Sequence, residues 1–211
     1  MFDEKISVLI PFKSDGGYRE KNWQWIKRRY ETLLPNAEIC IGSSDIEPFS
    51  RSAAINDAAR RATREIFMIA DADISFDTKQ IELGIDALKD YVWVLPFVYS
   101  NFLKEDQTTW LLNQEPSITM SDIDFTGCHT CTGINSQIVI VPRQYFEKVG
   151  GFDERFKGWG CEDDAFLMAM YKHCGANTRL DGFSTWHLHH PHASMDNYGN
   201  NLSILQDFYL K

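Results

Sequence analysis

Five apolar residues run directly into two carboxylates at residues 66–73, IFMIADAD. A continuous apolar run of this length is typical of a strand that is covered on both faces, as in a parallel sheet. We therefore predict a central strand at 66–70, with Asp71 and Asp73 just beyond its C-terminal end. Sheets of this kind bind their ligands at that end of the strands.

The chain around this strand alternates between strand and helix patterns. Strands are predicted at 6–12, 38–42 and 92–97, and helices at 18–34, at 50–62 with Ser50 as N-cap, and at 78–88. This alternation predicts an α/β fold whose sheet is parallel in its first half. Because parallel strands end at one edge of a sheet, the residues that follow the first strand should lie near Asp71 and Asp73.

The second half of the chain is less regular. Residues 102–124 are polar and lack periodicity, which indicates a long loop with short pieces of structure. A strand is predicted at 138–141, and helices at 142–149, 163–174 and 201–211. With 211 residues, no repeat and no clear linker, the chain fits a single domain, 1–211.

The charge and composition exclude several classes of protein. A net charge of −9 and the lack of a basic stripe make nucleic acid a poor partner. No apolar run approaches the ~20 residues of a membrane span, and the N-terminus lacks the basic and apolar segments of a signal peptide. We therefore expect a cytoplasmic protein with no membrane span.

The five cysteines are odd in number and irregularly spaced, so a disulfide framework is not expected. Cys128 and Cys131 have CxxC spacing, but a zinc site would need a second pair, and none is obvious. Two interpretations stay open for them: a structural or redox role, or two half-buried thiols near a loop.

Asp71 and Asp73 flank one small residue, and such a pair can hold a hard divalent cation. In an extended segment their side chains point to opposite faces, so one can ligate the ion while the other reaches a sugar or ribose hydroxyl. The ion would supply the positive charge that an acidic chain needs to bind a diphosphate. A solvated acidic loop is the alternative.

Three acids follow a Gly-Trp-Gly turn in residues 158–164, GWGCEDD. They fall at a predicted helix start, where the helix dipole favours anions, so capping is one interpretation. The other is that one carboxylate is a general base that takes the proton of an attacking hydroxyl. Trp159 offers an apolar face on which a sugar ring can stack.

Two further sets of residues carry binding chemistry. Four of the six histidines fall within residues 186–192, WHLHHPH, which indicates metal ligation, although spacing does not say by which one. Basic and aromatic residues that can pair with a diphosphate or stack on a nucleobase are Phe12, Lys13, Arg19, Phe49 and Arg51. The alternative interpretation for each of these five residues is an ordinary surface or core position with no role in binding.

These pieces, in this order, resemble the GT-A glycosyltransferases, and within them the β-1,4-galactosyltransferase and polypeptide N-acetylgalactosaminyltransferase group with its bacterial chondroitin-polymerase-type relatives. The most specific piece is 158–164, which is similar to the family's Gly-Trp-Gly-Gly-Glu-Asp-Asp segment, with Cys161 in place of a glycine. The resemblance implies the GT-A fold, a Rossmann-like mixed sheet flanked by helices.

The resemblance also implies roles for the donor-side residues. Pro11, Phe12 and Lys13 match the segment that contacts the nucleotide, with Lys13 where the family has an arginine. The sequence around Phe49 and Arg51 is similar to a Phe-Asn-Arg segment that binds uridine diphosphate.

The remaining roles concern the metal and the acceptor. Asp71 and Asp73 match the DxD motif, with Asp73 the expected direct metal ligand and Asp71 facing the donor sugar. Glu162 and Asp163 match acids that bind the acceptor, and Asp163 matches the base of the inverting members. His187 is the first choice for the downstream metal histidine and His190 the second.

The sequence thus predicts transfer of a hexose or N-acetylhexosamine from a UDP-sugar to a hydroxyl on a glycan, protein or small molecule, with Mn²⁺ or Mg²⁺ bound. Residues 1–100 are expected to form the nucleotide-sugar half, and 125–195 the half that binds the acceptor and completes the metal site. A haloacid-dehalogenase-type phosphatase, whose nucleophile motif is also DxD after an apolar strand, is one alternative. A non-catalytic nucleotide-sugar-binding module is another.

Overall fold

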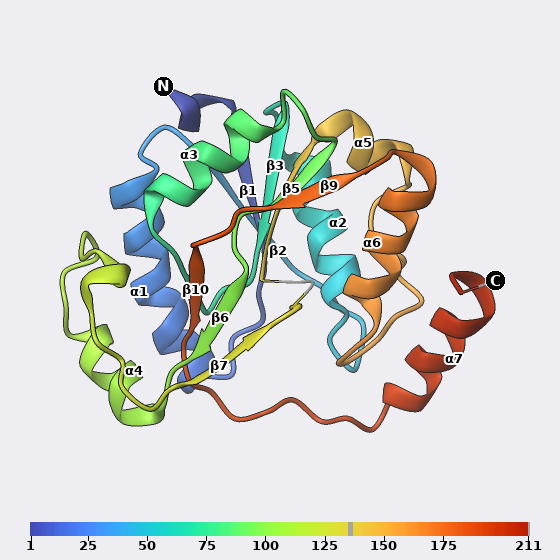
Figure 1. Ribbon diagram of the computed structural model, residues 1–211. Coiled ribbons are helices and arrows are strands. Elements are labelled where there is room, and N and C mark those ends of the chain that lie inside the picture. The colour runs from blue at the N-terminus through green and yellow to red at the C-terminus, as the bar shows by residue number, and fades with distance from the viewer. Residues whose placement is uncertain (135–136, 211) are drawn as a thin grey trace.

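A computed structural model describes residues 1–134 and 137–210. Its main sheet contains six strands in the order β2-β1-β3-β8-β5-β9 (Figure 1). Their bounds are β1 Ile6–Pro11, β2 Glu38–Gly42, β3 Ile66–Ala70, β5 Trp93–Leu95, β8 Ile138–Pro142 and β9 Asn177–Arg179. The strands β1, β2 and β3 are parallel, whereas β8 is antiparallel to both β3 and β5. The prediction of a mixed α/β sheet with a parallel first half is confirmed.

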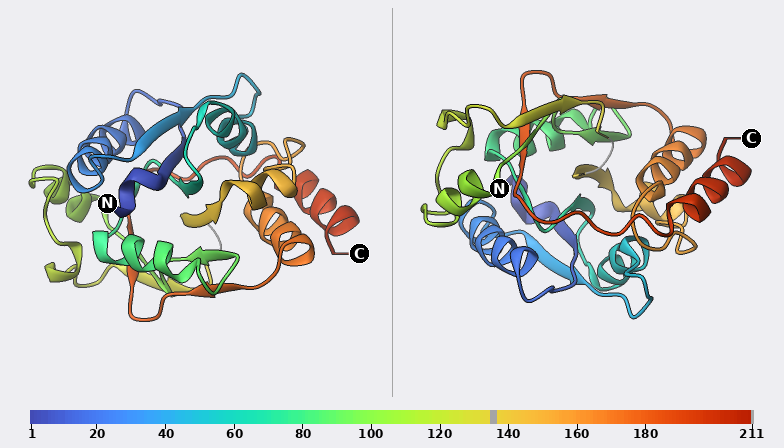
Figure 2. Two further views of the ribbon diagram at one scale, coloured as in Figure 1. Left: turned by 90° about the horizontal axis from the view of Figure 1, so that it is seen from above. Right: turned by 90° about the horizontal axis from the view of Figure 1, so that it is seen from below.

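Helices cover both faces of this sheet. Seen from above, α1 and α3 lie on one side, and α2, α5 and α6 on the other (Figure 2). Their bounds are α1 Tyr18–Leu33, α2 Arg51–Arg61, α3 Thr78–Ala87, α5 Arg143–Lys148 and α6 Glu162–His173. Every residue of β1 is buried, as an apolar strand between two helical layers must be. Ser50 caps α2 as predicted, since its hydroxyl accepts a hydrogen bond from the Ala53 amide at 3.2 Å.

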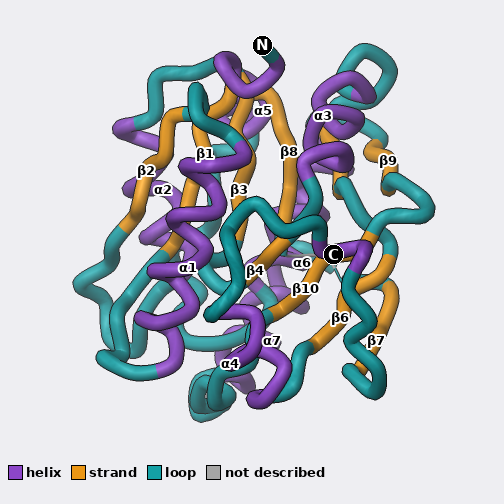
Figure 3. Tube along the Cα trace, turned by 90° about the vertical axis from the view of Figure 1, so that its left-hand side faces the viewer, coloured by secondary structure: helices purple, strands orange, loops and turns teal. Residues whose placement is uncertain are grey.

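A second, smaller sheet lies at the end of the molecule toward which β1 and β3 run (Figure 3). Its four strands follow the order β4-β10-β6-β7, with bounds β4 Ile74–Ser75, β6 Tyr99–Phe102, β7 His129–Thr132 and β10 Ser184–His187. In it, β10 pairs antiparallel with β4, which places His187 opposite Ile74. This pairing brings the histidine-rich segment beside the residues that follow β3.

The segment predicted as a long loop is largely ordered by one buried arginine. It contains helix α4, Glu105–Leu112, and the 3-10 turn η2, Met120–Asp122. Arg29, which is 2% exposed, donates to the carbonyls of Phe76, Pro116 and Ile118 at 2.6–2.7 Å. These bonds tie the unperiodic residues after α4 to α1. Helix α4 and η2 agree with the short pieces of structure predicted for this segment, but the sequence pattern did not locate α4, because the helix is short and weakly amphipathic.

The C-terminal helix begins earlier than predicted. It is α7, Tyr198–Phe208, and the last residue of the predicted helix, Lys211, lies outside the described residues. The segment between β10 and α7 crosses the lower end of the molecule in Figure 1 before α7 packs beside α6. Within residues 1–134 and 137–210, no helix has the length and apolar character needed to cross a lipid bilayer.

Candidate functional site

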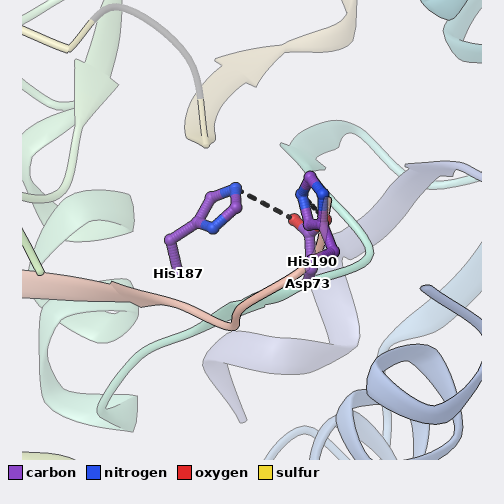
Figure 4. Close-up of side chains that lie close together, drawn as sticks. All are labelled: Asp73, His187 and His190. Atoms are coloured by element: carbon purple, nitrogen blue, oxygen red, sulfur yellow. Dashed lines mark ion pairs between the residues drawn. The ribbon is translucent and has the colours of Figure 1, made fainter. Parts of the chain in front are cut away.

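Asp73 and two histidines from the other end of the chain converge beyond the end of β3. One ligand atom from each of Asp73, His187 and His190 lies within 4.8 Å of the other two. His190 Nε2 is 3.0 Å from Asp73 Oδ2, and His187 Nε2 is 3.7 Å from Asp73 Oδ1. Figure 4 shows both rings directed at the carboxylate. In the described residues this is the one group of three such side chains close enough to hold an ion.

Backbone contacts fix the segment that carries the histidines. The Leu188 amide donates to the Asp73 carbonyl at 2.9 Å, which continues the pairing of β10 with β4. The next residue, His189, is held through its backbone: its carbonyl accepts from Asn22 Nδ2 at 3.0 Å, and its amide donates to Thr108 Oγ1 at 2.8 Å. Both anchoring side chains are buried, so the position of His190 is set by α1 and α4.

The ring orientation of His190 suits a metal ligand. Its Nδ1 lies 2.8 Å from the Pro191 carbonyl oxygen, which can only accept, so Nδ1 donates and Nε2 faces Asp73 with its lone pair available when neutral. A ligating histidine characteristically donates its other ring N–H in this manner.

The charges in this group are strongly coupled. Burial by itself raises the pKa of Asp73, but the two histidines and Arg19 outweigh burial and hold that pKa well below its ordinary value. Burial lowers the pKa of His187. For His190, burial is outweighed by the hydrogen bond to Asp73, and its pKa is raised. An ionised carboxylate is thus held against imidazoles, and this is the donor set that a divalent ion would need.

A second cluster links the end of β3 to the start of α6. Arg51, at the start of α2, donates from Nε to Asp71 Oδ1 at 2.7 Å and from Nη1 to Asp163 Oδ1. The same Nη1 lies 3.7 Å from Glu162 Oε1. The Arg51 side chain is 16% exposed, and its pKa is raised because three carboxylates outweigh the cost of its burial.

Glu162 is the most buried acid of this cluster. Burial and the neighbouring charge of Asp163 raise the pKa of Glu162 to about 8. Its Oε1 faces Arg51, whereas Oε2 is buried without a hydrogen-bond partner. A buried polar atom with no partner costs free energy, so this oxygen marks a place where a ligand hydroxyl would be favourable.

The Gly-Trp-Gly turn delivers these acids in an unusual conformation. Cys161, the N-cap of α6, has φ +72°, which belongs to the left-handed region that glycine prefers. Gly160 just before it has φ +105°, and a Cβ there would lie 2.9 Å from the Tyr198 ring. Trp159 is 49% exposed and its ring centroid lies 5.7 Å from that of Tyr198. The turn thus leaves an open aromatic face beside the acids.

The residues predicted to bind the nucleotide lie around the same end of the sheet, but in different settings. Pro11 ends β1, and Phe12 packs on Trp23 with 5.7 Å between ring centroids. Lys13 forms an exposed ion pair with Glu47, and Phe49 is half-buried. Arg19 points at the metal group, with Nη1 3.6 Å from Asp73 Oδ2.

The structure separates the two aspartates, both of which the sequence offered as metal ligands, with Asp73 as the expected direct one. Asp73 stands with the histidines, whereas Asp71 is paired with Arg51 and is not part of the three-residue group. Residues 71–74 form a turn, closed by the Ile74 amide donating to the Asp71 carbonyl at 3.3 Å, and the two side chains leave this turn in different directions.

Several residues at the site carry no signal in the sequence. Thr108 and Asn22, which position His189, are ordinary polar residues of helices, and only the tertiary contacts show their role. The Tyr30 hydroxyl is buried without a partner. Asn201 of α7 binds the turn before α6.

The CxxC cysteines are half-buried free thiols at β7, as one interpretation of the sequence predicted. In the chain as described, Cys128 and Cys131 belong to no group of residues that could hold a metal ion.

Comparison with known families identifies two overlapping regions. Residues 47–150 match the model of glycosyl transferase family 2, and residues 122–193 match the model of the N-terminal domain of galactosyltransferase. The first region contains Arg51, Asp71 and Asp73, and the second contains the acids of α6 and both histidines. A comparison with curated protein sequences gave no match.

Solved structures with the same fold include two glycosyltransferases. The catalytic domain of Drosophila β1,4-galactosyltransferase 7, in complex with xylobiose, has a TM-score of 0.58 and 16% identity, over 96% of this chain and 79% of that chain. Glucosyl-3-phosphoglycerate synthase from Mycobacterium tuberculosis, in complex with Mn²⁺, UDP-glucose and phosphoglyceric acid, has a TM-score of 0.54 and 10% identity, over 96% and 77% of the two chains. The two family matches support a glycosyltransferase, and the solved structures show that the chain shares the GT-A fold with the galactosyltransferases.

Proposed function

We propose that this glycosyltransferase moves a hexose or N-acetylhexosamine from a UDP-sugar to a hydroxyl acceptor with inversion, using a bound Mn²⁺ ion. The observation that carries the proposal is the convergence of Asp73, His187 and His190 beyond the end of β3. A nucleotide sugar is an anionic substrate, and the net charge of this chain is −9, so the diphosphate needs a local positive centre, which a metal ion would supply.

The three side chains fit a divalent ion. They offer one carboxylate oxygen and two imidazole nitrogens, a set that accepts first-row divalent metals and leaves coordination positions for a ligand. Solved relatives support manganese: one structure of Drosophila β1,4-galactosyltransferase 7 contains manganese, UDP-Gal and xylobiose, with a TM-score of 0.51 and 17% identity. When bound, the ion would stabilise the charge that develops on the departing diphosphate.

The basic residues near the metal group would bind the rest of the donor. Arg19 already lies beside Asp73, so its guanidinium can reach a diphosphate that shares the ion. Lys13 follows the C-terminal end of β1, and Phe49 directly precedes the N-cap of α2; both would meet the nucleotide. Arg51 would orient Asp71 toward the donor sugar and would also contact the diphosphate.

Asp163 would act as the base. Its partner Arg51 holds it on the same side of the site as Asp71, where its carboxylate would take the proton of the attacking hydroxyl. Glu162, with a pKa raised to about 8 and one partnerless oxygen, would hydrogen-bond an acceptor hydroxyl. Trp159 would stack on an acceptor sugar. A sugar acceptor is supported by the xylobiose in the Drosophila complex, and a protein or small-molecule acceptor would present the same hydroxyl chemistry.

The donor and metal can be tested without knowing the acceptor. A thermal-shift screen of sugar nucleotides, with Mg²⁺, Mn²⁺, Fe²⁺, Zn²⁺ or EDTA, should give a Tm increase for UDP-sugars only when an ion is present. At a concentration of ~100 times Kd, a ligand adds about 2.7 kcal/mol to the stability of the folded state. A Tm that is insensitive to every sugar nucleotide would contradict the proposal.

Catalysis is tested by slow hydrolysis of the donor identified in that screen. Asp163→Asn should lower turnover by at least ~100-fold while donor affinity stays within about twofold. Unchanged turnover would rule out Asp163 as the base. Release of phosphate from a simple phosphomonoester would instead favour the phosphatase alternative, and donor binding without any turnover would favour the binding module.

A further inference from the structure

A buried asparagine on the C-terminal helix holds the turn that precedes the acids of α6. Asn201 is 0% exposed. Its Nδ2 lies 3.0 Å from the Lys157 carbonyl, 2.9 Å from the Gly160 carbonyl and 3.3 Å from the Trp159 carbonyl. Its Oδ1 accepts from the Lys157 amide at 3.3 Å and from Asn197 Nδ2 at 3.1 Å. One side chain therefore binds three of the four carbonyls and one of the four amides of residues 157–160.

This turn needs an external support because its own backbone is strained. Cys161 is a non-glycine residue at φ +72°, and such conformations persist only where the surrounding structure holds them. Asn201 binds the carbonyl of Gly160, the residue immediately before Cys161. The dihedral angles of Cys161 set the direction in which Glu162 and Asp163 leave the turn.

The support comes from the segment that also carries the histidines. The chain passes from His190 through residues 191–197 into α7, and Figure 1 shows this segment running from β10 to the start of α7. Asn197, at the start of α7, adds a bond from its own Nδ2 to the Lys157 carbonyl at 2.8 Å. The metal group and the acids are thus joined through α7 as well as through Arg51.

We propose that Asn201 is a positioning residue for transfer: it holds the 157–160 backbone, keeps Cys161 left-handed, and so aims Glu162 and Asp163 at the acceptor. The proposal rests on the proposed function in that it assigns these two acids to the acceptor. In the described part of the chain, Asn201 forms no hydrogen bond or ion pair with Asp73, His187 or His190, so donor and metal binding should not depend on it.

The test compares Asn201→Ala with Asn200→Ala in the full-length protein. Asn200 is the adjacent, exposed asparagine of α7, and its Nδ2 binds only Asn197 Oδ1, at 2.8 Å, among the described residues. Asn201→Ala should lower kcat for donor turnover at least tenfold, while the Kd for UDP with Mn²⁺ stays within about twofold. Asn200→Ala should change neither. Equal kcat in the two variants would overturn the proposal.

Two further variants separate positioning from simple attachment of the helix. Leu205→Ala loosens the packing of α7 on Phe156 and Ala165, a cluster that Cys161 also contacts, but it leaves every hydrogen bond of Asn201 to the turn in place. It should lower the Tm and keep kcat, and a loss of kcat equal to that of Asn201→Ala would overturn the assignment. Cys161→Gly added to Asn201→Ala should recover at least threefold of the lost kcat, because glycine adopts positive φ freely. No recovery would refute the role of Asn201 in holding Cys161.

A readout without activity keeps the test independent of the proposed function. Lys157 is exposed, and its carbonyl is bound by Asn201 and Asn197, so trypsin cleavage after Lys157 should rise several-fold in Asn201→Ala and stay unchanged in Asn200→Ala. If the wild-type protein turned over no UDP-sugar, the proposed function would fail while this comparison still decided the role of Asn201. Unchanged cleavage in a folded Asn201→Ala protein would contradict the positioning role.

Discussion

The replacement Arg51→Met should expose how strongly the acids around this arginine depend on it. Arg51 is the cation that contacts Asp71 and Asp163 within 2.7 Å and Glu162 at 3.7 Å. Methionine retains most of the apolar stem and removes the charge. At neutral pH the carboxylates of Asp71 and Asp163, each with a side chain 23% exposed, would then lose this cation, whereas Glu162, whose pKa is about 8, is largely protonated.

The magnitude follows from the geometry. At an effective dielectric constant of ~20, a charge pair ~4 Å apart contributes about 4 kcal/mol, and desolvation of the ions offsets much of the sum over such pairs. Removing one partner of a buried ion pair typically costs about 3–5 kcal/mol. Since two of the acids are nearly a quarter exposed, we expect the lower end, about 3 kcal/mol, at neutral pH.

Urea denaturation followed by tryptophan fluorescence measures this loss as a change in the free energy of unfolding. Arg60→Met is the matched control: it lies on the same helix, its side chain is 64% exposed, and its ion pairs are 3.6 and 3.9 Å long. It should cost under ~1 kcal/mol. The deficit of Arg51→Met should also shrink as the pH falls, because the uncompensated acids then bind protons. Equal losses in the two variants, or a deficit that is independent of pH, would refute the reasoning.

Three other replacements test separate parts of the structure. The pKa of Glu162 is about 8 in the folded protein and 4.5 in the unfolded chain, so its protonated form stabilises the fold below pH 4.5, and this stabilisation is lost as the pH rises through 8. Glutamine cannot ionise. In urea titrations, Glu162→Gln should therefore be more stable than the wild type by ~1–3 kcal/mol at pH 9 and equally stable at pH 4. His190→Ala should weaken Mn²⁺ binding by at least ~10-fold in calorimetry. Thr108→Ala should cause a smaller loss of Mn²⁺ affinity, because it removes the hydrogen bond that holds the His189 backbone. Equal Mn²⁺ affinity in the wild type and His190→Ala would exclude that histidine as a ligand. Arg29→Met should cost ~3 kcal/mol or more, because three carbonyls lose their donor, and a loss under 1 kcal/mol would show that water replaces it.

Local patterns determined the elements around the site. The apolar run at 66–70 could only be a strand covered on both faces, and Ser50 before an alanine-rich period predicted the start of α2, since both depend on neighbours along the chain. The acids of 158–164 were likewise placed at a helix start by local composition. The existence of a carboxylate pair, an acid cluster and a histidine cluster was therefore readable before any contact was known.

Tertiary structure alone decided how these pieces combine. Asp71 and Asp73 are chemically equal in sequence, and the direction of each side chain from the end of β3 sends one to Arg51 and the other to the histidines. Of the clustered histidines, His187 and His190 reach Asp73 because β10 pairs with β4. The backbone of His189, by contrast, forms hydrogen bonds with side chains of α1 and α4. No pattern among the sequence neighbours of Asn201 predicts its role. Such choices arise from long-range packing, which no local period encodes, because residues brought together by strand pairing and helix docking are far apart along the chain.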